Sequence, residues 1–287
     1  MPERPPAMTA NSPKFIGVTG LPRAGSTLVC QLLAQHPDVH SEVHTSPLCN
    51  ALLSLRRTVS DDTFFLAQLD ASFEQSYGHL TSAMRGFLQG WYAGAECRAV
   101  VDKNRAWLHC IEMLLKIEAD AKLVVCIREL GQIYGSIEAR HQSTILIDFI
   151  DHLADFDRFG RADALFAKDK AIGAPLISLR AVADLPAPVQ DRLYFVRLED
   201  LTSRPAACMS HLYAWLGLPD FRIDADHLAT GAQESDSHYH MKYGHAQRTA
   251  ILPRTVHAVP PRIQSLIEAV HPWFYTSYYP GFASRQR

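Results

Sequence analysis

The most informative segment of the chain lies near the N-terminus and reads Phe15-Ile-Gly-Val-Thr-Gly-Leu-Pro-Arg-Ala-Gly-Ser-Thr-Leu-Val29. It holds an apolar run, a glycine-rich loop and a helix start, which is the order found in phosphate-binding loops. The spacing is G-x-x-x-x-G-S-T, so Ser26 stands where a P-loop nucleoside triphosphatase has its lysine. Backbone N–H groups and the positive end of the helix can still bind a phosphate, and Arg23 adds a cation. The stretch therefore predicts a phosphate site that lacks the usual equipment for a γ-phosphate.

Short apolar runs that indicate buried parallel strands recur along the chain. They are Phe15 to Thr19, Arg98 to Asp102, Lys122 to Ile127 and Leu193 to Leu198. Segments with helical spacing lie between them, among them Thr27 to Gln35, Arg105 to Glu118 and Gly131 to His141. This alternation predicts a single α/β domain with a central, mostly parallel sheet flanked by helices. Ligands of such sheets bind beyond the carboxyl ends of the strands.

Two inserts and a late loop interrupt this pattern. The inserts, about Leu48 to Gly94 and Thr144 to Lys170, are helical in pattern, and we expect them over the active-site edge as walls of a substrate pocket. Gly231 to Thr255 is rich in His, Ser, Gln and Gly, which indicates a long loop. Residues 1–13 are rich in proline and predict a disordered leader without a signal peptide, so the folded domain should span residues 14–287.

The composition of the 287 residues is that of a globular protein, with 47% hydrophobic and 20% charged residues. A net charge of -2 argues against nucleic acid as a partner and favours a small ligand. The six cysteines form no C-x-x-C pair and lie mostly in apolar segments, which indicates reduced core residues. No apolar segment reaches membrane-helix length, so we expect a soluble, cytoplasmic protein without a membrane span.

The segment Pro22-Arg-Ala-Gly-Ser-Thr-Leu28 resembles the 5′-phosphosulfate loop of sulfotransferases that use 3′-phosphoadenosine 5′-phosphosulfate (PAPS), with the pattern P-[KR]-[SA]-G-[ST]-[ST]. Its arginine and leucine, and the helix exit Gln35-His-Pro-Asp-Val39, are most similar to the tyrosylprotein sulfotransferases and their bacterial relatives. The resemblance implies a P-loop-like sulfotransferase fold, PAPS as co-substrate, adenosine 3′,5′-bisphosphate (PAP) as product, and no metal. It implies cofactor contacts from Pro22, Arg23, Ala24, Gly25, Ser26, Thr27 and Leu28.

Two further motifs follow in the order that this family has. Asp102-Lys-Asn104 resembles the K-D/N element, which implies that Lys103 meets the transferring sulfuryl group. We expect Arg23 and Lys103 to act as catalytic cations that neutralise the leaving 5′-phosphate. The strand that ends at Arg128, with Ser136 eight residues on, resembles the 3′-phosphate element. An arginine can offer a bidentate fork to a phosphate there, and the serine a hydroxyl. The family usually has D-P or D-G after this arginine, whereas this chain has Glu129-Leu130.

The C-terminal third carries two more matches. Val196-Arg-Leu-Glu-Asp-Leu201 resembles the family's Y-E-D-L strand and helix, and we interpret it as structural. The late loop has a basic cluster, and related enzymes close a loop from this region over the 3′-phosphate and adenine, which implies roles as clamps for Lys242 and Arg248. His238 and His240 have a spacing seen in metal sites, but no Cys or carboxylate pattern completes one.

The general base has two candidates. The segment His40-Ser-Glu-Val-His-Thr45 falls where the tyrosylprotein branch has its catalytic glutamate, and an ungapped alignment puts His44 at that position. Glu42 lies two residues earlier, and cytosolic sulfotransferases use histidine for this task. Either side chain has suitable chemistry for accepting a proton from an acceptor hydroxyl.

These observations predict a sulfotransferase that moves a sulfuryl group from PAPS to an acceptor hydroxyl. The acceptor could be a small molecule, a carbohydrate, a lipid or a peptide, and a homodimer is a family-level expectation. One alternative is a P-loop small-molecule kinase with Asp102 as its metal-binding carboxylate, and the missing lysine opposes it. The other is a non-catalytic nucleotide-binding protein that keeps the loops but lacks a base.

Overall fold

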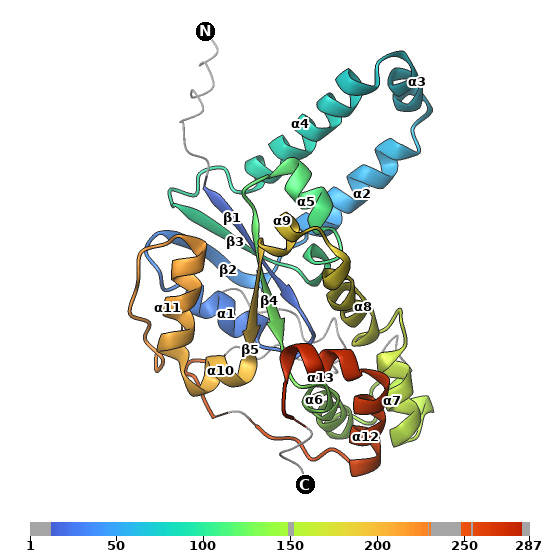
Figure 1. Cartoon of the computed structure of the whole chain (residues 1–287), viewed down its shortest axis with the longest axis vertical. Coiled ribbons are helices and arrows are strands. Elements are labelled where there is room, and N and C mark those ends of the chain that lie inside the picture. The colour runs from blue at the N-terminus through green and yellow to red at the C-terminus, as the bar shows by residue number, and fades with distance from the viewer. Residues whose placement is uncertain (1–12, 149–151, 229, 231–247, 254, 283–287) are drawn as a thin grey trace.

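The computed structural model describes residues 13–148, 152–228, 230, 248–253 and 255–282 (Figure 1). The predicted leader, apart from its last residue, lies outside these ranges, and so does most of the predicted late loop, including Lys242. The boundaries of the predicted leader and domain therefore stay predictions.

The centre of the molecule is a sheet of five parallel strands in the order β2-β3-β1-β4-β5. The strands are β1 (Lys14–Gly20), β2 (Val39–Thr45), β3 (Ala99–Lys103), β4 (Lys122–Ile127) and β5 (Leu193–Arg197). Every residue of β3 is buried, and so are all residues of β1 and β4 except the first of each, because layers pack against both faces of the sheet. The predicted α/β class and the four predicted strands are confirmed.

The fifth strand, β2, was not predicted. Only Val39 and Val43 are buried in it, because it lies at the edge of the sheet and its other side chains are polar. Its pairing with β3 shifts register between Ser41 and Thr45, and Val43 has a φ of 69°, which is unusual for a β-branched residue. The bulge lies between the two candidate bases, Glu42 and His44.

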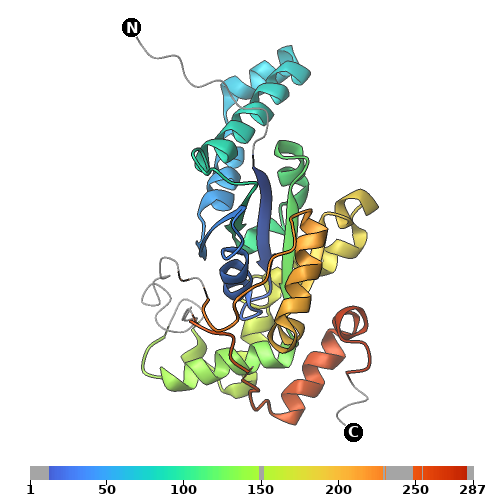
Figure 2. The same cartoon turned by 90° about the vertical axis from the view of Figure 1, so that its left-hand side faces the viewer.

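Helices surround the sheet (Figures 1 and 2). The α-helices are α1 (Ser26–Leu33), α2 (Leu48–Ser60), α3 (Thr63–Ala71), α4 (Phe73–Trp91), α5 (Ile111–Ile117), α6 (Leu130–Ser143), α7 (Arg158–Phe166), α8 (Gly173–Ala181), α9 (Ala187–Gln190), α10 (Leu198–Ser203), α11 (Pro205–Leu216), α12 (Pro261–Val270) and α13 (Pro272–Tyr278). Short 3-10 turns cover Arg105–Trp107, Leu153–Asp155 and Val182–Asp184. The predicted helix over Arg105 to Glu118 is thus split into a turn and α5.

Both inserts are helical, as predicted. They were also expected to wall a pocket at the active-site edge, but Asn50 is the only one of their described residues that lines the cavity at the carboxyl edge of the sheet. The first forms α2, α3 and α4, and Figure 1 shows α3 and much of α4 extending away from the body of the molecule. No residue of α3 is buried, and Phe64 is 80% exposed. The second insert contains α7, which a buried ion pair between Arg161 and Glu138 fixes to α6.

All six cysteines lie in the described part of the chain and carry free thiols. Four of them are buried, as the apolar surroundings in the sequence predicted. Within the described ranges, none of the helices has both the length and the apolar character needed to cross a lipid bilayer.

Candidate active site

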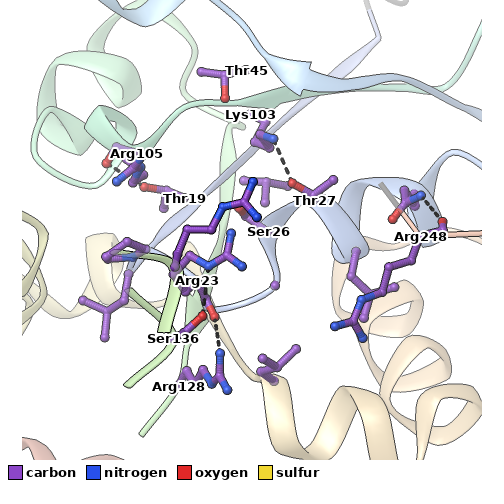
Figure 3. Close-up of a pocket in the computed structure, with 18 of the residues that line it drawn as sticks. Thr19, Arg23, Ser26, Thr27, Thr45, Lys103, Arg105, Arg128, Ser136 and Arg248 are labelled. Atoms are coloured by element: carbon purple, nitrogen blue, oxygen red, sulfur yellow. Dashed lines mark hydrogen bonds between the residues drawn. The ribbon is translucent and has the colours of Figure 1, made fainter. Parts of the chain in front are cut away.

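A cavity of about 610 Å³ lies at the carboxyl edge of the sheet (Figure 3). Residues at or just after the carboxyl ends of all five strands line it: Thr19, Thr45, Lys103, Arg128 and Leu198. Its wall also carries further cations, namely Arg23, Arg105, Arg140 and Arg248. None of the described residues that line it is an aspartate or a glutamate. A cavity with this charge is suited to a ligand with several negative charges.

The glycine-rich loop between β1 and α1 forms the floor of this cavity. Gly20 has a φ of +119°, and a Cβ there would lie 2.1 Å from the carbonyl oxygen of Cys126 in β4. Gly25 has a φ of +89°, and a Cβ there would lie 2.6 Å from Cδ1 of Leu198. The positive φ favours glycine at both positions, and at Gly20 a side chain would also collide with the backbone of β4.

The helix α1 begins directly after this loop. Gly25 is its N-cap residue, and Gly25, Ser26 and Thr27 all line the cavity. The first N–H groups of an α-helix have no partner within the helix and carry the positive end of its dipole. The predicted phosphate-binding loop therefore borders the cavity, and its binding of a phosphate stays a prediction.

Lys103 stands at the end of β3, next to β1 in the sheet. Its Nζ donates a hydrogen bond to Oγ1 of Thr27 at 3.0 Å, and the residue is only 6% exposed. Figure 3 shows this pair at the cavity wall. The structure thus brings together the predicted lysine and the first turn of α1, although they are far apart in the sequence.

Asp102, the residue before Lys103 in β3, is held by polar contacts. The buried Asp102 accepts hydrogen bonds from the hydroxyl of Tyr92 at 2.7 Å and from Nε1 of Trp107 at 2.6 Å. Burial raises the pKa of Asp102, and hydrogen bonds from Ser46, Trp107 and Tyr92 oppose that rise. Asp102 is absent from the described residues that line the cavity. The kinase alternative needs this carboxylate as a metal ligand, whereas in the structure it accepts hydrogen bonds from the buried side chains of Tyr92 and Trp107.

The predicted 3′-phosphate element is assembled on the other side of the loop. Arg128 follows β4, and its guanidinium donates to the carbonyl oxygens of Arg23 at 3.2 Å and of Thr255 at 3.3 Å. Nε of Arg23 donates to Oγ of Ser136 on α6 at 3.2 Å (Figure 3). Arg23, which the resemblance assigned to the 5′-phosphosulfate, therefore bridges from the loop to the 3′-phosphate element in this structure.

Glu129, where the family usually has aspartate, has a structural role. Its carboxylate accepts hydrogen bonds from the N–H groups of Gly131 and Gln132, at 2.9 and 2.7 Å, and so caps α6. It also accepts from the hydroxyl of Tyr275 in α13 at 2.6 Å and from Nε2 of Gln264 in α12 at 3.1 Å. The residue after Arg128 therefore connects the start of α6 to the C-terminal helices.

The two candidate bases contact each other at the edge strand. Nε2 of His44 lies 3.1 Å from Oε2 of Glu42, and Nδ1 of His44 lies 3.0 Å from the carbonyl oxygen of Glu42. Neither is among the described residues that line the cavity, although the next residue, Thr45, is. The structure brings the two candidates together beside the cavity wall, and the choice between them stays open.

Of the two predicted clamps, the structure describes Arg248. It lies in the cavity wall, and its carbonyl oxygen accepts a hydrogen bond at 2.8 Å from Nε2 of Gln31 in α1 (Figure 3). Among the residues that the structure describes, no group of three or more His, Cys, Asp or Glu side chains is placed to hold a metal ion.

Some cavity residues were missed from the sequence. Arg140 follows Ser136 by four residues on the same helix, so helical spacing could have identified it. Arg105 follows Lys103 by two residues, and the oxygen of its backbone carbonyl accepts a hydrogen bond from Oγ1 of Thr19 at 2.9 Å. His257 comes from a distant segment without a motif, and only the fold brings it to the cavity.

The fold and this cavity define an α/β protein with a P-loop-like glycine-rich loop and a cation-lined cavity at the carboxyl edge of its sheet. The chain belongs to the sulfotransferase family, because the model of that family matches residues 13–222 of its 287 residues. The protein is accordingly a sulfotransferase enzyme.

Of the three solved structures described next, the first has a TM-score above 0.5 and agrees with this fold. A sulfotransferase from Alicyclobacillus acidocaldarius is 13% identical, with 96% of this chain and 99% of that chain covered and a TM-score of 0.54. The sulfotransferase STF9 from Mycobacterium avium is 18% identical over 94% of this chain and 77% of that chain, with a TM-score of 0.48. The sulfotransferase domain of the Synechococcus PCC 7002 olefin synthase is 21% identical over 75% of this chain and 76% of that chain, with a TM-score of 0.47. None of the curated proteins matches the chain.

Proposed function

We propose that this enzyme transfers the sulfuryl group of PAPS to an acceptor hydroxyl and releases PAP. The observation that carries the proposal is the arrangement of two anion-binding groups in one cavity. One consists of Lys103, Thr27 and the start of α1, and the other of Arg128, Arg23 and Ser136. PAPS has two anionic ends, a 5′-phosphosulfate and a 3′-phosphate, and two such groups suit it.

The proposed reaction is an in-line displacement at sulfur. The acceptor oxygen forms a bond to sulfur, the bond between sulfur and the bridging oxygen breaks, and the electron pair stays on the 5′-phosphate of PAP. Lys103, the N–H groups of the loop, Ser26 and Thr27 would stabilise the charge that develops on this leaving group. Positioning and cationic stabilisation would therefore supply most of the catalysis.

The acceptor proton needs a base, and Glu42 or His44 is proposed for it. Support comes from their place on β2, where Glu42 lies three residues and His44 one residue before Thr45 in the cavity wall. Arg128, Ser136 and Arg248 are proposed to bind the 3′-phosphate. Lys242, which lies outside the described residues, is proposed as a further clamp from the family resemblance.

The test combines binding and turnover. Calorimetry with PAP, and PAP release from PAPS across a panel of hydroxyl acceptors, should both give signals with the full chain. Binding of ATP with Mg²⁺ and phosphoryl transfer, without PAP binding, would support the kinase alternative. Stoichiometric PAP binding without turnover on any acceptor would support the non-catalytic alternative.

A cytoplasmic location and a homodimer are proposed as well. The location is supported by the six free thiols, which persist in reducing compartments. Fractionation of cells and light scattering of the purified protein would test the two proposals.

A further inference from the structure

The segment around His257 packs along α6 at the candidate 3′-phosphate site. The N–H of His257 donates to Oε1 of Gln132 at 2.8 Å, and its carbonyl oxygen accepts from Nε2 of the same glutamine at 3.0 Å. Gly135 lies one turn further along α6, and a Cβ there would lie 2.7 Å from the Cβ of His257. This reciprocal pair and the close approach fix the backbone that carries the imidazole.

His257 is half-buried and lines the same cavity as Arg23, Arg128 and Ser136. Two residues earlier, the carbonyl oxygen of Thr255 accepts a hydrogen bond from Arg128 at 3.3 Å. His257 therefore lies close to Arg128 in the structure, although more than a hundred residues separate them in the sequence.

The charges of two arginines act on this imidazole. Arg128 faces it from the end of β4 and Arg23 from the glycine-rich loop, and burial together with these two charges holds the pKa of His257 below its usual value. Helix α6 contributes neutral groups from Gln132 and Ser136, and Arg140 lies in the same cavity wall. No aspartate or glutamate belongs to the described lining. We therefore expect the neutral form of the imidazole to predominate near pH 7 in the free protein.

We propose that His257 is a ligand of the nucleotide 3′-phosphate and takes up a proton when the nucleotide binds. The inference rests on the proposed function, since it needs a nucleotide that carries a 3′-phosphate. A phosphate dianion attracts the imidazolium and offsets the repulsion from Arg23 and Arg128. The proton comes from solvent, so no other reactant is needed.

The sign of the pH dependence follows from linkage. Below the pKa of His257 in the empty site, the imidazole is charged in both states, and its contribution to nucleotide affinity does not change with pH. Between that pKa and the higher pKa in the complex, affinity falls by up to about tenfold per pH unit as pH rises, because one proton is taken up. Above the pKa in the complex, the contribution is lost.

The proposal also concerns selectivity. Adenosine 5′-monophosphate (AMP) lacks the 3′-phosphate, so its binding should leave His257 neutral. Proton uptake should accompany PAP and not AMP, which makes His257 one of the groups that distinguish the two nucleotides.

The experiment is calorimetry of PAP binding to the full chain at pH 7.5, in two buffers with different ionisation enthalpies. The two binding enthalpies give the number of protons taken up. We expect net uptake by the wild type, less uptake by His257→Gln, and no comparable uptake with AMP. The phosphate itself, with a second pKa near 6, is largely dianionic at this pH. Any proton that the phosphate releases on binding is released with the wild type and with His257→Gln alike. The difference in proton uptake between these two proteins therefore reports His257.

His271→Gln is the matched control, because His271 is also partly buried with its pKa lowered, first by burial and then by Arg180, and is not among the cavity residues. It should take up protons like the wild type. Equal uptake by the wild type and His257→Gln would overturn the inference and leave the proposed function standing. Absence of PAP binding by the wild type would overturn both.

A second measurement does not depend on the variant. The imidazole resonance of His257, followed by NMR as pH changes, should show a higher pKa with PAP than in the free protein. An unchanged pKa in the PAP complex would also overturn the inference.

Discussion

Replacing Arg128 by alanine should weaken PAP binding without unfolding the protein. Arg128 is 6% exposed, and its guanidinium lies between the glycine-rich loop and the segment at Thr255. Loss of one partner of a desolvated charged pair costs about 2–5 kcal/mol, which corresponds to a Kd higher by about 30- to 3,000-fold. Since Ser136 and Arg23 stay in the site, we expect the lower end, about 30- to 100-fold.

The assay is calorimetry with PAP and with AMP. Only the 3′-phosphate should report the loss, so AMP affinity should change by less than about threefold, or 0.7 kcal/mol. Arg128→Lys keeps the charge but loses the fork, and its PAP affinity should fall between those of the wild type and Arg128→Ala. An unchanged PAP affinity in Arg128→Ala, or an equal loss for both nucleotides, would refute the assignment.

Three further predictions concern turnover and stability. Lys103→Ala should lower turnover about a hundredfold or more, because it removes a cation from the leaving phosphate, and near-normal PAP release would contradict this role. Gly20→Ala should cost about 3 kcal/mol or more in denaturant unfolding, since its Cβ would meet the backbone of Cys126, and an unchanged midpoint would exclude that clash. Glu138→Gln should cost about 3 kcal/mol at pH 7 by leaving the buried Arg161 without its charged partner. Burial alone would raise the pKa of Glu138, but the hydrogen bonds and charge of Arg161 hold it below its usual value. The difference in unfolding free energy between the wild type and Glu138→Gln should therefore shrink as pH falls below about 4, and a difference that grows there would contradict this role.

The sequence was sufficient for the centre of the fold and for the local parts of the site. The strands β1, β3, β4 and β5 contain short apolar runs, so their place in the interior could be predicted from the sequence. The loop could be predicted because its backbone needs positive φ angles at Gly20 and Gly25, which makes the two glycines visible in the sequence. Order along the chain then related Lys103 and Arg128 to that loop.

What escaped prediction depends on tertiary contacts. The edge strand β2 has only two buried apolar residues, and its bulge at Val43 breaks the alternation that would have revealed it. His257 has no neighbouring motif and reaches the cavity through contacts with Gln132 and Gly135. The helical arm from α2 to α4 was predicted as helix, but nothing in its pattern indicated that α3 would extend away from the sheet.

The hydrogen bonds of Glu129 have a consequence for the extent of the functional unit. The family match ends at residue 222, yet Glu129 accepts hydrogen bonds from Gln264 and Tyr275, beyond that limit. A chain shortened to residue 222 would keep Arg128 and Ser136 but lose these donors, His257, and the carbonyl of Thr255 that Arg128 contacts. Described residues between 255 and 275 thus contact the candidate nucleotide site, and we expect a chain shortened to residue 222 to bind PAP more weakly than the full chain.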